Sequence, residues 1–134
     1  MCVFCQIVRG EIPAERVGET PSCIAFLDTR PVFPGHVLVV PRLHVETLTD
    51  LDATLVEPLF SFVQRVARGV ENGMKADGSF VAMNNRVSQS VPHLHVHVVP
   101  RKKKDGLKGF FWPRQKYASD EEMRAVGEAI RSAI

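Results

Sequence analysis

The sequence contains few of the residues that build disulfide-bonded or membrane-spanning proteins. It has only three cysteines, one tryptophan and one tyrosine among 134 residues. Such a small, odd number of cysteines is poor material for a disulfide framework. No apolar run approaches the ~20 residues that span a bilayer. These shortages exclude a disulfide scaffold and predict a protein without membrane contact.

The first residues also lack the basic start and continuous apolar stretch of a secretory signal. We therefore expect a cytoplasmic protein whose cysteines stay reduced. With 45% hydrophobic and 24% charged residues, the composition is typical of a globular protein, and the length suits one domain over residues 1–134.

The chain has little net charge, +2 at pH 7, which argues against a general electrostatic attraction for nucleic acid. The charge is unevenly distributed, however, and one stretch, residues 101–117, is strongly basic. It holds one acid, Asp105, and seven bases: Arg101, Lys102, Lys103, Lys104, Lys108, Arg114 and Lys116. We expect any anionic partner of the surface to meet this stretch.

Apolar periodicity predicts the order of the elements. We expect a short helical turn at 3–9, strands at 16–19, 22–28, 36–40, 79–83 and 93–99, and a long helix capped at Thr49 or Asp50 and ended by Gly73. Pro58 should kink or restart this helix. Ser119 and Glu122 form a capping box for a final helix. The predicted class is α+β, an antiparallel sheet with one long helix and a C-terminal helix.

Three of the five histidines lie in the run from His93 to Val99. Alternate residues of a strand face opposite sides, so His93, His95 and His97 should share one face. Three imidazoles are costly to bury unless they have polar partners, so this face is expected to line a phosphate or metal site. A spacing of about 6.6 Å along the strand is too wide for all three to bind one ion.

Cys2 and Cys5 form a C-x-x-C pair, which predicts half of a metal site or a redox pair. No strand precedes it, although a redox pair usually opens a helix after a strand. The plain alternative is two free cysteines at a frayed terminus. Cys23 falls within a predicted strand and is expected to be a small core residue.

The histidine run resembles the signature of the histidine-triad (HIT) superfamily, His-φ-His-φ-His-φ-φ, where φ is apolar. Further matches are the N-terminal segment 2–13, Phe26-Leu-Asp28, Pro34 to Pro41, His44, and Asn84-Asn85 through Gln89-Ser90. The N-terminal C-x-x-C is similar to bacterial Hint-like members. The extended segment 101–134 is more similar to Fhit-like members. The resemblance implies a HIT-like fold across the chain.

The resemblance also implies roles for individual residues. His95 would be the nucleophile toward the α-phosphate of a nucleotide, and His97 would stabilise charge or assist the leaving group. The matching nucleotide-binding positions are Asp28, Asn84, Gln89 and Ser90. Each also has an ordinary interpretation, since Asn84 and Gln89 could be turn residues and Asp28 could cap a turn. His36 stays outside the catalytic set.

A structural zinc ion is a further implication, with Cys2, Cys5, His44 and His93 as its four ligands. The resemblance implies a homodimer as well. The basic 101–117 stretch with Phe110, Phe111 and Trp112 could meet the extra phosphates of a polyphosphate, bind nucleic acid, or pack on a neighbouring subunit. We leave these three interpretations open, although nucleic acid is the least expected.

The expected function is a nucleotidyl hydrolase that acts on purine nucleoside phosphoramidates or dinucleoside polyphosphates. It would work through a covalent nucleotidyl-histidine and release a nucleoside monophosphate. Two alternatives stay open: a nucleotide-binding regulatory protein with incidental turnover, and a nucleotidylyltransferase. The sequence does not identify the physiological substrate, the preferred base or the dimer geometry.

Overall fold

A computed structural model describes residues 1–107 and 113–134. The chain divides into two compact units, Met1–Lys103 and Lys104–Ile134, and each is described by itself. Lys108, Phe110, Phe111 and Trp112 of the predicted basic and aromatic stretch lie outside the described residues. The prediction of one domain over the whole chain stays a prediction.

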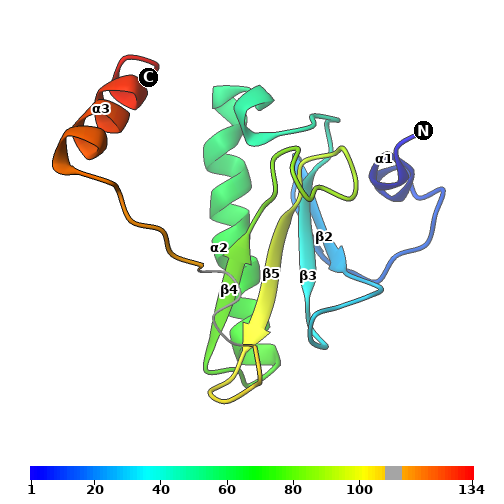
Figure 1. Cartoon of the computed structure of the whole chain (residues 1–134). Helices are drawn as coiled ribbons and strands as arrows, with labels where there is room; N and C mark the ends of the chain where they lie inside the picture. Colours follow the sequence, from blue (N-terminus) through cyan, green and yellow to red (C-terminus); the bar gives the residue numbers. More distant parts are fainter. Residues whose placement is uncertain (108–112) are drawn as a thin grey trace. The chain divides into compact units, whose positions relative to one another are not determined.

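The first unit is built on a five-stranded antiparallel sheet (Figure 1). Its strands are β1 (Arg16–Glu19), β2 (Cys23–Leu27), β3 (Val37–Pro41), β4 (Gly78–Ala82) and β5 (Val96–Arg101), in the spatial order β1-β2-β3-β5-β4. The strands β3 and β5 are therefore neighbours, with Leu38 opposite His97. This pairing places β3 beside the end of the histidine run. The antiparallel sheet with its helices confirms the predicted α+β class.

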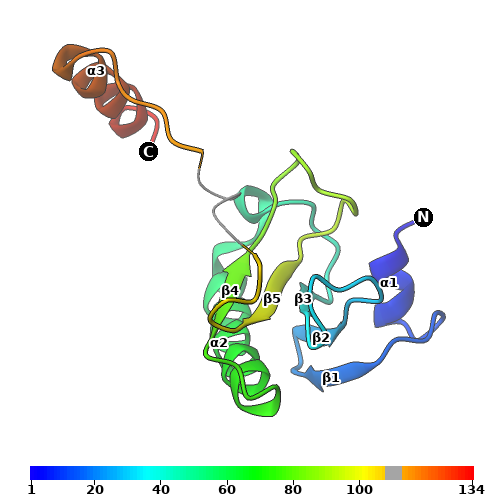
Figure 2. The same cartoon turned by 60° about the horizontal axis from the view of Figure 1, so that its bottom comes forward.

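Two helices cover opposite faces of this sheet, as Figures 1 and 2 show. The long helix α2 (Val56–Gly73) packs through Leu59, Phe62, Val63 and Val70 onto alternate strand residues such as Ala25 and Val39. The short helix α1 (Val3–Val8) packs through Phe4 and Ile7 onto Ile24, Phe26, Leu38 and Val40. Because β2 and β3 have a helix on both sides, they are almost continuously apolar.

The histidine run begins before the last strand, so the predicted strand 93–99 is wrong at its start. β5 begins at Val96, and only His97 of the three histidines lies within it. The Leu94 N–H donates to the carbonyl of Val45 at 2.7 Å instead of joining the ladder. The predicted alternation nevertheless holds, because Leu94, Val96 and Val98 all pack beneath α2.

The predicted helix cap at Thr49 or Asp50 is also wrong. Two 3₁₀ turns, η1 (Leu48–Asp50) and η2 (Ala53–Leu55), come first, and Asp52 caps the second by accepting from the Thr54 N–H at 2.9 Å. α2 then begins at Val56, which puts Pro58 in its first turn. A proline there removes no helical hydrogen bond, so the prediction that Pro58 restarts the helix describes the structure.

The second unit contains one helix, α3 (Asp120–Arg131), within its described residues. The predicted capping box is present: the Ser119 hydroxyl accepts from the Glu122 N–H at 3.1 Å, and the Glu122 carboxylate accepts from the Ala118 N–H. Met123, Val126 and Ile130 are exposed. No helix among the described residues is long and apolar enough to cross a membrane.

Candidate functional site

His95 lies on the α1 face of the sheet, beside His97, with their ring centroids 4.9 Å apart. Its Nδ1 is 2.7 Å from the backbone carbonyl of His93. A carbonyl only accepts hydrogen bonds, so His95 Nδ1 carries the proton. The other ring nitrogen, Nε2, therefore keeps a free lone pair, which is the form of imidazole that acts as a nucleophile.

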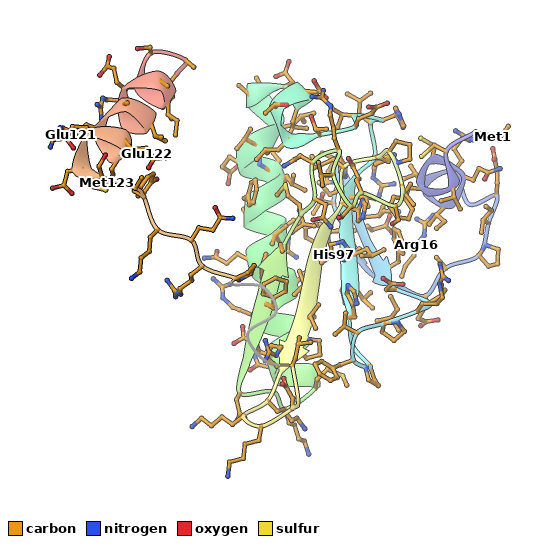
Figure 3. All side chains as sticks on the ribbon, in the orientation of Figure 1. Met1, Arg16, His97, Glu121, Glu122 and Met123 are labelled. Carbon is orange, nitrogen blue, oxygen red and sulfur yellow. The ribbon has the colours of Figure 1, made fainter. Side chains whose placement is uncertain are left out.

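A second hydrogen-bonded pair sets the tautomer of His97, which Figure 3 labels on β5. The Val32 N–H donates to His36 Nδ1 at 3.1 Å, so a neutral His36 carries its proton on Nε2. His36 Nε2 lies 2.9 Å from His97 Nδ1 and donates to it. His97 is then left with its own N–H on Nε2, ready to donate to a ligand.

Burial keeps these imidazoles neutral. It lowers the pKa of His97 from its ordinary 6.5 to about 4, with further lowering from His95 and His36. Burial also lowers the pKa of His36, and the Asp28 carboxylate, 3.8 Å from His36 Nδ1, only partly offsets this effect. His36 and His97 are thus a neutral donor and acceptor pair rather than two cations.

The sequence leaves His36 outside the catalytic set, whereas the structure brings it against His97. Strand alternation puts His36 on the same side of its strand as Leu38 and Val40. No local pattern, however, shows that this strand pairs with β5 in the register that opposes Leu38 to His97. The contact depends on that register.

A cavity of about 410 Å³ opens beside the two catalytic candidates. Its apolar wall comes from α1 and its following loop, and from two strands: Phe4, Ile7, Ile12, Phe26 and Leu38. Asp28, Arg30 and Ser90 add polar groups, and His95 and His97 also line it. An apolar slot with a few polar groups suits a flat aromatic base joined to a polar sugar phosphate.

The four predicted nucleotide-binding residues divide into two pairs. Asp28 and Ser90 line the cavity, whereas Asn84 and Gln89 are absent from its described lining. The Asp28 carboxylate also accepts from the Arg30 N–H at 2.9 Å, so it closes a turn as well. The Gln89 amide accepts from the Arg86 N–H at 2.8 Å and donates to the Glu46 carbonyl at 2.7 Å, which holds the loop that carries Ser90.

A larger hollow of about 510 Å³ lies on the opposite side, along α2. Its lining is mainly apolar, with Phe62, Val66, Val70 and Met74 from the helix region. It contains no histidine or cysteine among the described residues. His95 and His97 line the smaller cavity instead.

Cys2, Cys5, His44 and His93 come together next to the histidine cluster, with all four ligand atoms within 4.8 Å of one another. His93 Nδ1 lies 3.4 Å from Cys2 Sγ and 3.6 Å from Cys5 Sγ, and His44 Nδ1 lies 3.3 Å from Cys5 Sγ. Tetrahedral zinc with bonds of ~2.3 Å to sulfur and ~2.0 Å to nitrogen separates these atoms by about 3.5 Å. The four residues therefore fit a closed zinc site.

The protonation of these residues fits a cation too. His93 Nε2 donates to the Pro41 carbonyl at 2.8 Å, which leaves Nδ1 unprotonated and facing the sulfurs. Burial and the neighbouring Cys2 raise the pKa of the Cys5 thiol. Two adjacent thiolates repel each other, and a bound cation would reverse this effect.

Comparisons with known proteins agree with this arrangement. The model of the HIT domain matches residues 9–104. Adenosine 5'-monophosphoramidase hnt1 of Schizosaccharomyces pombe is 35% identical, covering 99% of this chain and 98% of the relative. A HIT family structure from Bacillus subtilis has a TM-score of 0.88 at 31% identity, covering 99% of this chain and 96% of that one. A Zn-bound histidine triad family structure from Mycobacterium smegmatis has a TM-score of 0.75 at 37% identity, covering 99% and 97%.

Proposed function

The chain belongs to the HIT domain family, and from that premise we propose that it is a nucleotidyl hydrolase acting on purine nucleoside phosphoramidates. One observation carries the proposal: His95 has its Nδ1 proton held by the His93 carbonyl at 2.7 Å, so its free Nε2 can attack a substrate. The cavity beside it has room and polarity for a nucleoside phosphate. The hnt1 relative favours phosphoramidates over dinucleoside polyphosphates as the substrate class.

In the proposed reaction, His95 Nε2 forms a bond to the α-phosphorus while the bond from phosphorus to the leaving amine breaks. His97 Nε2–H donates a hydrogen bond to the α-phosphate oxygens and stabilises their charge. The departing nitrogen takes up one proton from solvent and leaves as the free amine. Water next attacks the nucleotidyl-histidine, gives up its proton to solvent and releases the nucleoside monophosphate and neutral His95.

The remaining residues would bind and orient the substrate. Asp28 is proposed to accept from the ribose hydroxyls, and Ser90 to donate to the phosphate. Their shared position in the cavity lining supports these two roles. Contact of Asn84 and Gln89 with the nucleotide remains a prediction from the resemblance. Gln89 already uses its amide within its own loop.

Hydrolysis of an adenosine phosphoramidate by the wild type and by His95→Ala tests the nucleophile. We expect the substitution to lower kcat about a thousandfold or more, because the covalent route is lost. Intact-mass analysis of quenched wild type should show an adenylylated chain that His95→Ala lacks. Glu57→Gln, an exposed change on α2, is the matched control. Equal turnover by wild type and His95→Ala would overturn the assignment, and tight AMP binding without turnover would favour the regulatory alternative.

We also propose that Cys2, Cys5, His44 and His93 hold one structural zinc ion. The separations of 3.3–3.6 Å between their ligand atoms support it. Elemental analysis should find about one zinc per chain, and Cys5→Ser should lose most of it, because a serine hydroxyl is a far weaker zinc ligand. Cys23→Ser is the cysteine control, since Cys23 lies in β2 outside the cluster. Wild type with reduced cysteines and no metal would contradict the site.

A homodimer in the cytoplasm is the proposed state of the protein. The edge position of β4 and the 43% exposure of Val81 on it support self-association. Reduced cysteines would keep the metal site intact in the cytoplasm. Light scattering of the purified chain should give twice its mass of 14.9 kDa.

A further inference from the structure

The candidate zinc site and the nucleotide cavity share helix α1, and the Phe4 ring and His93 connect them. We propose that they are energetically coupled, so that zinc on Cys2, Cys5, His44 and His93 raises the affinity of the cavity for a nucleoside monophosphate, and the nucleotide raises the affinity for zinc. This inference rests on the proposed function. It assigns the four ligands a role in substrate binding beyond tying the terminus to the sheet.

Helix α1 is the first shared element. Its six residues are too few to form a stable helix without outside contacts. Cys2 is its N-cap and Cys5 lies within it, and both belong to the metal cluster. Phe4 and Ile7 of the same helix form part of the cavity wall and are only 6% and 7% exposed. Between Cys2 and Ile7, residues of the metal cluster thus alternate with residues of the cavity wall.

The Phe4 ring is the second link. It makes edge-on contacts with His93, centroid to centroid 5.9 Å, and with His95 at 5.1 Å. Cys2 lies two residues before Phe4 in the sequence, and Cys5 directly follows it. A displacement of α1 would therefore move this ring away from the nucleophile and open the cavity wall at the same time.

His93 is the third link and reaches both sites through different atoms. Its Nδ1 faces the cysteine sulfurs, while its backbone carbonyl accepts the Nδ1 proton of His95 at 2.7 Å. The residue is fully buried, and the bond from its Nε2 to the Pro41 carbonyl fixes its ring. Metal ligation at Nδ1 would hold the residue that positions the nucleophile.

These links have a thermodynamic consequence. Ordering α1 and His93 costs conformational freedom that both ligands require. Whichever ligand binds first removes that cost for the second, and the coupling must be equal in both directions. We expect the factor to reach at least about fivefold, the lower end of the usual range for coupled sites.

The test uses the full zinc-loaded chain. The equilibrium transfer of zinc to a chromophoric chelator is measured with and without saturating AMP, and AMP affinity is measured by calorimetry before and after zinc removal. AMP should raise the affinity for zinc, and so reduce zinc release to the chelator, at least about fivefold, and zinc removal should weaken AMP binding by a similar factor. The release measurement needs only loaded protein, so it remains decisive even where the zinc-free chain unfolds.

Two variants separate this coupling from general stabilisation by a bound ligand. Phe4→Leu keeps an apolar side chain but loses the ring contacts, so AMP should still bind while its effect on zinc release shrinks. Gln6→Ala is the control on the same helix, because the Gln6 amide contacts Met1 Sδ and lies outside the cavity lining. It should retain the full effect of AMP. An equal effect of AMP in wild type and Phe4→Leu would overturn the route through the ring.

The outcomes also distinguish this inference from the proposed function. AMP that binds but leaves zinc release unchanged would overturn the coupling, and hydrolysis would stand. AMP that binds neither the loaded nor the zinc-free chain would overturn the proposed nucleotide site itself. A folded chain that binds no zinc would overturn the proposed zinc site and the coupling with it, and the proposed nucleotide site would stand.

Discussion

At the scale of single residues, the direction of each hydrogen bond decides what the histidines can do. A backbone N–H at Val32 and a backbone carbonyl at His93 fix the two ends of the cluster. Between them, His36 donates to His97 at 2.9 Å. His95 is therefore an acceptor, and His97 a donor, toward the cavity. A main-chain carbonyl only accepts and a main-chain N–H only donates, so these two groups set the direction of the hydrogen bonds in the cluster.

His36 is accordingly a positioning residue, and its substitution gives a prediction at this scale. His36→Leu removes the donor that holds His97 Nδ1, and a hydrogen bond of roughly 1–1.5 kcal/mol corresponds to about a tenfold loss in kcat. KM for the phosphoramidate should change little. His36→Gln, whose amide can donate in place of Nε2–H, should recover part of kcat. A tenfold loss that appears equally in His36→Gln and His36→Leu would point to packing instead.

At the scale of elements, the turn between β2 and β3 places Asp28 beside His36. The turn before β3 carries the chain from Asp28 back to His36, and the Asp28 N–H donates to the His36 carbonyl at 2.9 Å. Gly35 in this turn has a φ of +96°, a conformation that favours glycine. A Cβ there would lie 2.6 Å from Met74 Cγ. This turn therefore depends on the absence of a side chain.

Gly35→Ala should lower the free energy of unfolding by about 1–3 kcal/mol, because it adds both backbone strain and a collision with Met74. Urea denaturation measures the change. Gly78→Ala at the start of β4 is the matched control, since its Cβ would meet no atom within 4 Å and its φ is ordinary. A loss in Gly35→Ala no larger than that in Gly78→Ala would contradict the strain.

At the scale of the whole molecule, three buried or half-buried histidines link folding to pH. Burial is the largest cause that lowers the pKa of His36, His93 and His97. An unfolded chain binds protons on these residues near pH 6.5, whereas the folded chain holds His97 neutral down to about pH 4. The unfolded state thus takes up more protons in this window.

The free energy of unfolding should therefore fall as the pH is lowered from 6.5 toward 4. Urea denaturation at several pH values, with zinc and buffer composition held constant, measures the slope. His97→Gln removes one of the contributing groups. It should reduce the slope of the unfolding free energy against pH by up to the contribution of one proton. Because His97 keeps some solvent contact, the change is expected to be less than that limit. A slope that His97→Gln leaves unchanged would contradict the lowered pKa.

Much of the fold was predictable because its signals are local. The strand at 16–19 is present as predicted, the one predicted at 36–40 lies at Val37–Pro41, and Ser119 with Glu122 predicts a capped helix that is present. The start of β5 and the start of α2 were predicted wrongly. At the start of β5 the Leu94 N–H donates to the Val45 carbonyl, and before α2 the Leu48 N–H donates to the Asn85 side chain at 2.8 Å, so in both places a residue distant in sequence takes part. Local pattern cannot register such a contact.

The sequence alone determined which residues are candidates for the site: the spacing of His93, His95 and His97 and the C-x-x-C pair are short-range patterns that can be recognised without knowing the fold. Only the tertiary structure decided how these residues meet. It brought His36 to His97 across paired strands, set Phe4 against His95, and placed His93 between two sites. The reason is physical: these contacts join residues up to 91 positions apart, and their geometry depends on strand register and helix packing.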